Sequence, residues 1–474
     1  MNNELSLIYH EIDFLLPVHR FNIRFSYVTK KGLPFMREFL LRLIHLAPMS
    51  PSQVASYFDL TKREVKEALS DLINSGDLLF LNDGTVSLTN QSSAYFSGLG
   101  TTPQVNTVLE YGGLYGFELA SFQCIGTKQI KDIWCNGFAL EPNLENIANS
   151  EKLAKKNFQT QFYKLLNDEV FPGLRYDKSL GKPSIYKMES IKKIGLVPLR
   201  LNNKFSMDTH GSALERQDIE IFDDASAVQD LITAKLHQAM KPNNNKEIVA
   251  AIEILEDVYT KSIICENGFE ISEFFNEKLS TQLTSKSSDI FIGPIYSNAN
   301  WSELEKQLTP ILNKMQKEHL DVVDEFIWLA PSDEFWGRST RLKSCFDLVV
   351  SKAMTTGKEP KRLYKPKMYV PVADEKDKSS KNRWSKDFSN NIQHVNALVE
   401  GFLFGNVEVL LLPDRLAVVI YHLSLPEKFN VSLPIGFITT DLVTVKRINK
   451  HLVNYTSGYS AVDQLRDLGP ISKL

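Results

Sequence analysis

This 474-residue chain has few cysteines and no long apolar run. Its four cysteines are scattered and form no Cys-x-x-Cys pair: Cys124, Cys135, Cys265 and Cys345. This spacing argues against a disulfide framework and against a structural zinc site. The longest largely apolar stretches, 407–412 and 416–421, are far shorter than the roughly 20 residues that cross a bilayer. We therefore expect no membrane partner.

The chain also lacks a strong overall charge. It has 54 Lys and Arg against 57 Asp and Glu, a net charge of −3, and 43% of its residues are hydrophobic. This composition is typical of folded globular proteins, and the length suggests two or three domains. Residues 1–20 have no basic segment ahead of their short apolar stretch, so they do not resemble a secretory signal and we expect a cytoplasmic protein.

Motifs of the common catalytic sites are missing as well. The sequence contains no phosphate-binding Gly-x-Gly-x-x-Gly or Gly-Lys-Ser/Thr loop, no Gly-x-Ser-x-Gly elbow and no set of kinase motifs. We therefore expect no catalytic residues, no cofactor and no metal site.

Residues 33–89 carry the clearest local signals. Pro34 and the spacing of the following apolar residues predict a helix that stops at Ala47-Pro48, and Ser50-Pro51 predicts the start of a second one. Thr61 and Glu64 fit a capping box at the start of a third helix. A hairpin with an Asp83-Gly84 turn is expected to follow.

This order of helices and hairpin resembles the winged helix-turn-helix family over about 55 residues. In that family the third helix enters the major groove and the wing touches the backbone. The resemblance implies that DNA is contacted by Gln53, Lys62, Arg63 and Lys66, and by Asn82 and Thr85 of the wing. Winged helices also dock proteins, and the third helix carries Glu64, Glu67 and Asp71 beside its basic residues, so a docking role stays open.

Residues 289–454 resemble, more loosely, the phospholipase D-like fold. The likeness rests on a strand ending in Ala-Pro-Ser, a helix ending in Gly, a hairpin, and a last Gly-containing strand followed by Asp and a helix. A further helix is expected over 391–402. The family uses His-x-Lys followed by Asp, and its Asp place falls on Asp414. The His and Lys places then fall on Val407 and Val409, so the resemblance implies an inactive site.

A second candidate for nucleic-acid contact is the cationic stretch 337–393, which holds 14 Lys and Arg against 6 Asp and Glu. Its cations are interleaved with aromatic residues, a mixture that suits a nucleic-acid backbone or single strand. An acidic partner, the acidic segment 211–280, or plain solvation would explain the same composition. The candidate DNA-binding residues here are Arg338, Arg341, Lys361, Arg362, Lys365, Lys367, Arg383 and Trp384.

Together these patterns predict an α/β multidomain protein. We expect a winged-helix domain with an N-terminal strand over 1–95, a mixed α/β linker region over 96–210 and an α/β layered domain over 211–474, phospholipase D-like and degenerate. The favoured hypothesis is a non-catalytic DNA-binding accessory subunit of a larger bacterial DNA-processing or phage-defence complex, with DNA and other protein subunits as partners. No residue identifies that cellular setting. A winged-helix transcription regulator and a nuclease with a divergent site are the alternatives.

Overall fold

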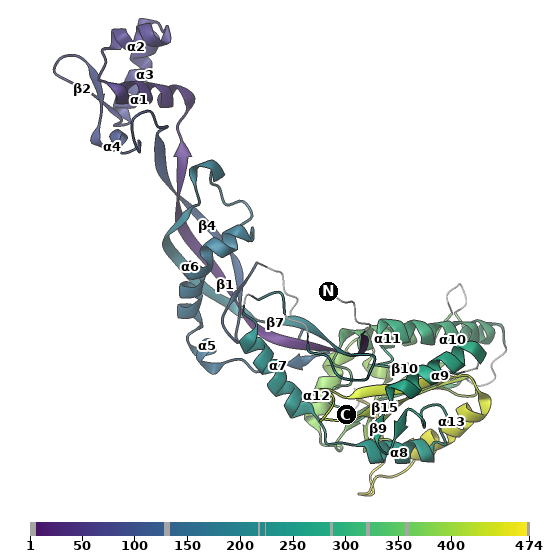
Figure 1. Cartoon of the computed structure of the whole chain (residues 1–474). Helices are drawn as coiled ribbons and strands as arrows, with labels where there is room; N and C mark the ends of the chain where they lie inside the picture. Colours follow the sequence, from purple (N-terminus) through teal and green to yellow (C-terminus); the bar gives the residue numbers. More distant parts are fainter. Residues whose placement is uncertain are drawn as a thin grey trace.

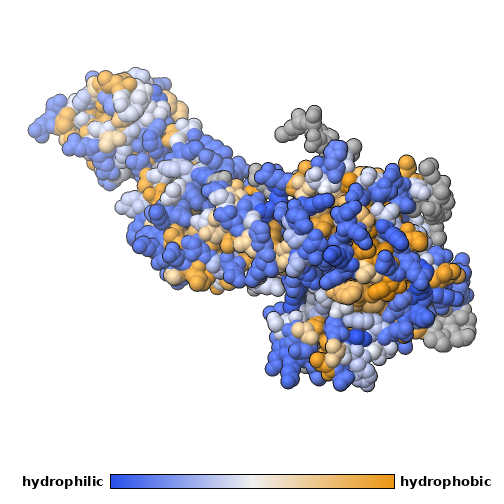
Figure 2. Space-filling view, turned by 60° about the horizontal axis from the view of Figure 1, so that its bottom comes forward, coloured by the Kyte–Doolittle hydropathy of each residue, from blue (hydrophilic) through white to orange (hydrophobic). Residues whose placement is uncertain are grey.

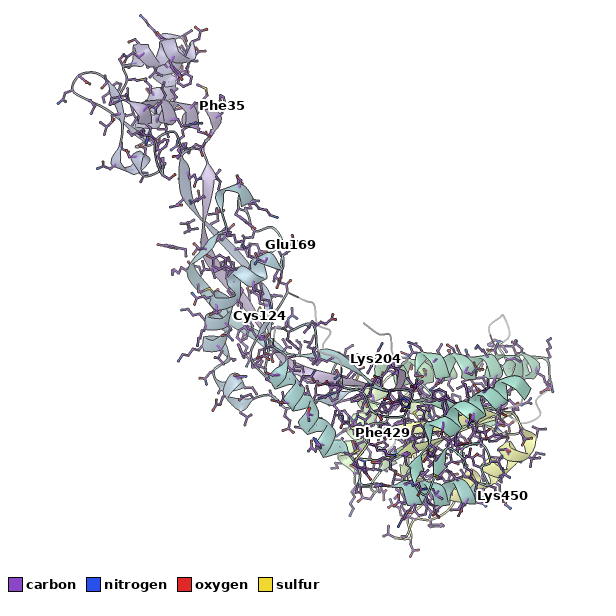
Figure 3. The ribbon with its side chains drawn as sticks, viewed as in Figure 1. Phe35, Cys124, Glu169, Lys204, Phe429 and Lys450 are labelled. Atoms are coloured by element: carbon purple, nitrogen blue, oxygen red, sulfur yellow. The ribbon has the colours of Figure 1, made fainter. Side chains whose placement is uncertain are left out.

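The computed structural model describes residues 6–127, 133–216, 219–222, 224–284, 288–318, 323–355 and 360–471. The molecule is elongated and bent, with a small helical module at one end, a narrow stalk and a large α/β domain at the other end (Figure 1). We call these parts the tip module (residues 33–103), the stalk (residues 6–32 and 104–207) and the C-terminal domain (residues 208–471). Labelled side chains follow this path, with Phe35 in the tip module, Cys124 and Glu169 along the stalk, and Lys450 in the C-terminal domain (Figure 3).

The stalk is built on one very long strand. β1 (Leu7–Gly32) has 26 residues, which at about 3.3 Å per residue extend over roughly 85 Å. It pairs antiparallel with β4 (Gln104–Glu118) on one side and with β7 (Ser184–Met207) on the other. Two short strands, β5 (Cys124–Gly126) and β6 (Phe138–Ala139), complete the five-stranded sheet. The sheet therefore joins segments on both sides of the tip module.

One face of the stalk sheet is packed against helices. α5 (Leu144–Ala148) and α6 (Ser150–Asn167) cover this face, and Phe158 and Phe162 of α6 contact Phe25 of β1 with ring centroids 5.4 and 5.7 Å apart. This aromatic cluster supplies the apolar burial that a thin antiparallel sheet needs. A 3-10 turn (Lys178–Leu180) precedes β7.

The tip module contains the predicted helices and hairpin. The helices are α1 (Phe35–Leu46), α2 (Pro51–Phe58), α3 (Lys62–Asn74) and the short α4 (Asn90–Ser93), and the hairpin is β2 (Leu78–Phe80) and β3 (Val86–Leu88). Ser50 and Thr61 form the capping boxes of α2 and α3. Val65, Leu69 and Leu72 of α3 are buried in the core of the module, as their spacing predicts.

The C-terminal domain is built on one mixed sheet of eight strands, in the order β10-β16-β15-β14-β11-β12-β13-β17. β11, β12 and β13 are parallel, and the other pairings are antiparallel. The strands are β10 (Ser288–Ile292), β11 (Glu325–Leu329), β12 (Lys365–Val372), β13 (Val395–Val399), β14 (Val407–Leu412), β15 (Leu416–Leu423), β16 (Leu433–Thr439) and β17 (Asp467–Pro470).

Helices cover both faces of this sheet, because its central strands are apolar on both sides. Alternate residues of β11 belong to two separate cores: Ile327 packs in one, and Trp328 in the other. The first core also takes in the base of the stalk. The helices are α7 (Ser226–Ala239), α8 (Asn245–Ile254), α9 (Ile271–Thr284), α10 (Asn298–Lys317), α11 (Thr340–Ser351), α12 (Lys378–Asp387) and α13 (Leu442–Thr456), with a small hairpin of β8 (Ile264–Cys265) and β9 (Gly268–Phe269). No helix in the ranges described here has the length and apolar content to cross a membrane.

The prediction of an α/β multidomain chain is confirmed, and the structure shows several sheets, but the helix predicted over 391–402 is wrong. A 3-10 turn (Ile392–His394) leads there into β13, whose five residues are all buried. Val395, Leu398 and Val399 have the spacing of a helix face, yet a short apolar run buried on both sides gives the same pattern as a central strand. The region 96–210 also contributes the long strands β4 and β7 to the stalk.

Candidate functional site

The basic residues predicted to contact DNA in the tip module lie on its surface. Lys62, Arg63 and Lys66 are exposed on α3, and the Arg63 side chain is 88% exposed. Lys62 and Lys66 are one turn apart and share one flank of the helix. The far end of the stalk holds α3 well away from the C-terminal domain (Figure 1). The structure therefore brings these three cations together on an open helix surface.

Carboxylates occupy the rest of the exposed surface of α3. Glu64 accepts hydrogen bonds from the backbone N–H and the side-chain hydroxyl of Thr61, each at 2.8 Å. These two hydrogen bonds lower the pKa of the Glu64 carboxyl. Glu67 accepts a hydrogen bond from Arg63 Nε at 3.0 Å, and Asp71 is exposed one turn further on. Helical geometry puts Glu64 and Asp71 on the flank away from Lys62. The helix thus has a basic flank and an acidic flank.

The other three residues predicted in the tip module have local structural partners. The Gln53 side-chain oxygen accepts a hydrogen bond from Ser50 N at 2.8 Å, which closes the capping box of α2. Thr85 donates its hydroxyl to Asp83 Oδ1 at 2.6 Å within the hairpin turn, where Gly84 has a φ of 81°. Asn82 is exposed beside this turn. These contacts shape the module, and both Gln53 and Asn82 remain exposed.

The predicted cationic surface of the C-terminal domain is largely absent, because several of its members are buried or paired. Trp384 is 3% exposed and donates its indole N–H to Pro371 O at 3.0 Å, so its ring cannot stack on a base. Arg338 is buried, donates to Glu334 Oε2 at 2.7 Å and lies over the Phe138 ring at 4.1 Å. Both predictions are therefore corrected.

The remaining cations of this stretch divide into held and exposed groups. Arg341 donates to Tyr296 O at 3.0 Å, Lys367 lies 3.1 Å from Asp467, and Lys361 donates to the backbone carbonyls of Glu318 and Met315. Arg362 and Lys365 are exposed. The interleaved aromatics that suggested base stacking, Trp336, Tyr364, Tyr369 and Trp384, are all core residues.

Arg338 and Arg383 belong instead to a polar junction between the stalk and the C-terminal domain. Asp387 Oδ1 accepts a hydrogen bond from Asn136 N at 2.8 Å, and Asp387 Oδ2 lies 3.7 Å from Arg383 Nε. We call this junction the neck. On the stalk side, Asp13 of β1 is buried and accepts a hydrogen bond from Arg200 Nη1 at 2.9 Å. The Asp13 backbone N–H donates to Arg338 O at 2.7 Å.

A hollow of about 340 Å³ lies at the carboxyl ends of the parallel strands, where open α/β sheets commonly bind ligands. The loop that follows β13 is strained, because Glu400, Leu403 and Phe404 have positive φ. The carboxylates of the hollow surround the single guanidinium of Arg383, which makes the hollow unsuitable for a phosphate backbone. The polar lining includes Ser332, Glu334, Asp377, Ser380, Arg383 and Glu400.

A buried charged cluster next to this hollow escaped the sequence reasoning. His422 of β15 lies between two carboxylates, with Nδ1 3.1 Å from Asp333 and Nε2 3.0 Å from Glu408. Trp328 donates its indole N–H to Glu408 at 2.8 Å, and Ser432 donates to Asp333 at 2.5 Å. The three charged side chains are at most 6% exposed. The only signal in the sequence was a Glu and a His that interrupt the apolar stretches 407–412 and 416–423.

The cluster holds a charged imidazole inside the domain. Burial alone would lower the pKa of His422, but its hydrogen bonds to Asp333 and Glu408 outweigh burial and raise that pKa to about 9. Burial would raise the pKa of Asp333, and the contacts with His422 and Ser432 lower it to about 2. Both ring nitrogens of His422 are engaged, and the cluster is almost fully buried, with Asp333 also lining the hollow. The cluster therefore ties β14 and β15 to the loop after β11.

The positions of the phospholipase D-like pattern do not converge on a site. Val407 and Val409 are fully buried in β14, and Asp414 is exposed in the turn beyond the other end of that strand. The structural similarity to that fold stays a prediction. Comparison with protein-family models, with curated proteins and with solved structures finds no match to this chain.

Proposed function

We propose that the tip module is a winged-helix domain that contacts duplex DNA through α3, and that the chain is a non-catalytic accessory subunit. One observation carries the proposal: Lys62, Arg63 and Lys66 are exposed together on a helix held at the free end of a long stalk. A duplex can reach this surface without meeting the C-terminal domain. Contacts of this kind to phosphates fix position and give affinity without sequence specificity.

Charge sets an upper limit on the strength of this contact. Residues 33–103 hold 5 Lys and Arg against 7 Asp and Glu. Three phosphate contacts would give a slope of about −3 in a plot of log affinity against log salt. We therefore expect the tip module to bind DNA weakly by itself, and to need further contacts elsewhere in the chain or in a complex.

The test is the binding of labelled duplex and single-stranded DNA across a salt series, with and without magnesium. Replacing Lys62, Arg63 and Lys66 together by Glu is expected to weaken duplex binding at least tenfold, because three phosphate contacts become repulsive. The matched control reverses three exposed lysines of the C-terminal domain, K246E, K261E and K428E, with the same change in net charge.

Each outcome separates one class of function. Unchanged affinity in the α3 variant refutes the proposed contact. A strong preference for one duplex sequence favours a transcription regulator, and magnesium-dependent cleavage that survives purification favours a nuclease. Salt-dependent retention without cleavage supports an accessory subunit.

Protein docking by the same module is the second candidate, and exposed apolar side chains favour it. Tyr57 is 68% exposed and lines a shallow hollow with Phe39 and Leu46. Phe35 is 70% exposed and contacts Phe39, with ring centroids 4.4 Å apart. Figure 2 shows hydrophobic side chains among hydrophilic ones on the visible side of this module. Large exposed apolar groups of this kind mark interaction surfaces. Replacing Phe35 and Tyr57 by Ser would then abolish partner binding and leave DNA affinity unchanged.

A further inference from the structure

The stalk sheet has two unlike faces. One face carries the aromatic cluster under α6, and the other has no helix over it in the described residues. The register of the strands identifies the uncovered face. Asn22 of β1 is paired with Leu114 of β4 and Lys192 of β7, and these three residues point to the same side.

Basic side chains lie along the middle of this uncovered face. Arg20 and Arg24 flank Asn22 at the period of two that puts residues on one face of a strand. Lys192 is exposed beside them on β7, and Lys30 is exposed further toward the tip module. Within the described part of the chain, Arg20, Arg24 and Lys192 form no ion pair.

Acidic residues on the same face are fewer and partly occupied. Glu189 accepts a hydrogen bond from Ser26 at 2.6 Å and another from Lys187 at 3.0 Å. Glu110 is exposed on β4. The uncovered face therefore has an excess of positive charge, opposite to the tip module, in which acidic residues exceed basic ones.

Glycines leave part of this face free of side chains at Gly112 and Gly195, whereas Gly116 is buried against Val18 and Ile125. Arg24 is paired with Gly112 of β4, and Arg20 with Gly116 of β4 and Gly195 of β7. A Cβ atom added at Gly112 would lie 3.0 Å from Arg24 Cγ, so the arginine chain lies directly across the glycine. An open hollow of about 610 Å³ lies over Arg24 and Gly112, and Glu110 and Glu189 also line it. The cationic contacts for a phosphate backbone therefore depend on Arg20 and Lys192, which lie outside this lining, as well as on Arg24.

We propose that the uncovered face of the stalk binds the phosphate backbone of the same duplex that contacts α3. This inference rests on the proposed function. From Arg20 to Lys30 the strand extends for about 33 Å, close to the roughly 34 Å of one duplex turn. β1 leads into α1 through Leu33 and Pro34, so the two surfaces are parts of one continuous support. Two weak contacts on one support give a combined affinity that neither has alone.

The experiment compares two triple variants of the full chain with equal charge change. R20E/R24E/K192E alters the uncovered face, and K152E/K155E/K156E alters exposed lysines of α6 on the opposite face of the stalk. We expect the first variant to weaken duplex binding at least tenfold at low salt and to make the salt slope shallower by about 2 to 3, at about 0.9 per contact. The second variant is expected to change affinity less than threefold.

Duplex length gives a second readout. Wild-type affinity is expected to rise between duplexes of about 12 and about 24 base pairs, one and two turns, because only the longer one spans the tip module and the stalk. R20E/R24E/K192E is expected to lose this gain. If that variant does not fold, the neutral pair R24Q/K192Q, checked by circular dichroism, is measured in its place.

The outcomes distinguish the inference from the function on which it rests. If K62E/R63E/K66E weakens binding and R20E/R24E/K192E does not, the inference fails and the proposed function stands. If neither variant weakens binding, both fail. Equal loss in the uncovered-face and α6 variants would mean a general charge effect and would overturn the inference. The inference would also be overturned if the wild-type chain retained an acidic protein partner and R20E/R24E/K192E bound DNA with unchanged affinity.

Discussion

His422 carries a positive charge inside the C-terminal sheet because two carboxylates surround it. Its pKa of about 9 in the folded chain lies above its ordinary value of 6.5, so its stabilising effect is full below about pH 6.5 and is lost as the pH rises through 9. His10 faces the same cluster from β1, and burial lowers its pKa to about 4, so protonating it destabilises the fold on the acid side. The domain should therefore be most stable near neutral pH.

We expect His422→Gln to lower the free energy of unfolding by about 3–5 kcal/mol at pH 7, because it removes the cation between two buried carboxylates. The wild-type free energy should fall as the pH is raised from 7 to 10, while that of the variant should change much less. Denaturant unfolding followed by tryptophan fluorescence measures both, since Trp328 contacts Glu408 directly.

The exposed His210 supplies the control, and His210→Gln should leave stability and its pH dependence unchanged. Parallel pH curves for wild type and His422→Gln would show that the imidazole is not charged in the fold.

At the scale of elements, local signals explain why the tip module was predictable. Ser50, Thr61 and Gly84 mark ends and turns through contacts within a few residues, and the structure has elements at each of these positions. The stalk was not predictable in the same way, because β1 pairs with residues as much as 200 positions away. Spacing alone also could not reveal that Val395 is buried in a strand.

The cap of α3 is the element-scale feature that most affects the proposed DNA surface. Thr61→Ala removes the hydroxyl that accepts a hydrogen bond from Glu64 N at 3.3 Å. Loss of an N-cap costs about 1 kcal/mol, so the amides of α3 should exchange with solvent roughly fivefold faster. Hydrogen exchange measured by mass spectrometry gives this rate, and Ser70→Ala on the exposed middle of the same helix should not raise it. No change in Thr61→Ala would mean that other contacts fix the start of the helix.

At the scale of the whole molecule, the fold decides which of the predicted DNA-binding residues are accessible. The exposure of Lys62, Arg63 and Lys66 follows from the sequence, since an amphipathic helix puts its polar residues outside, and their contact with DNA stays a prediction. Arg338 and Arg383 were predicted to contact DNA, because the sequence of a basic stretch does not reveal which carboxylates the fold places beside it. Glu334 and Asp387 hold these guanidinium groups in the neck. We expect these contacts in the neck to fix the angle at which the stalk leaves the C-terminal domain.

This arrangement makes the neck the point at which a single change should alter the overall shape. Asp13 accepts hydrogen bonds from Arg200 and Asn202 of β7 and, at 3.3 Å, from Thr340 N of α11. Asp13→Asn replaces a carboxylate with an amide that cannot accept from all three groups while facing a guanidinium. We expect small-angle X-ray scattering to report a wider range of molecular dimensions for this variant, with helix and strand content unchanged.

Glu256→Gln provides the comparison, because it breaks an exposed ion pair with Arg447 that lies within the C-terminal domain. If Asp13→Asn scatters like wild type, the apolar packing at the stalk base fixes the angle without the polar neck. If the variant is broader, duplex DNA should leave the distribution broad, because α3 and the uncovered face of the stalk both lie on the same side of the neck and a duplex held by them does not restrain the C-terminal domain.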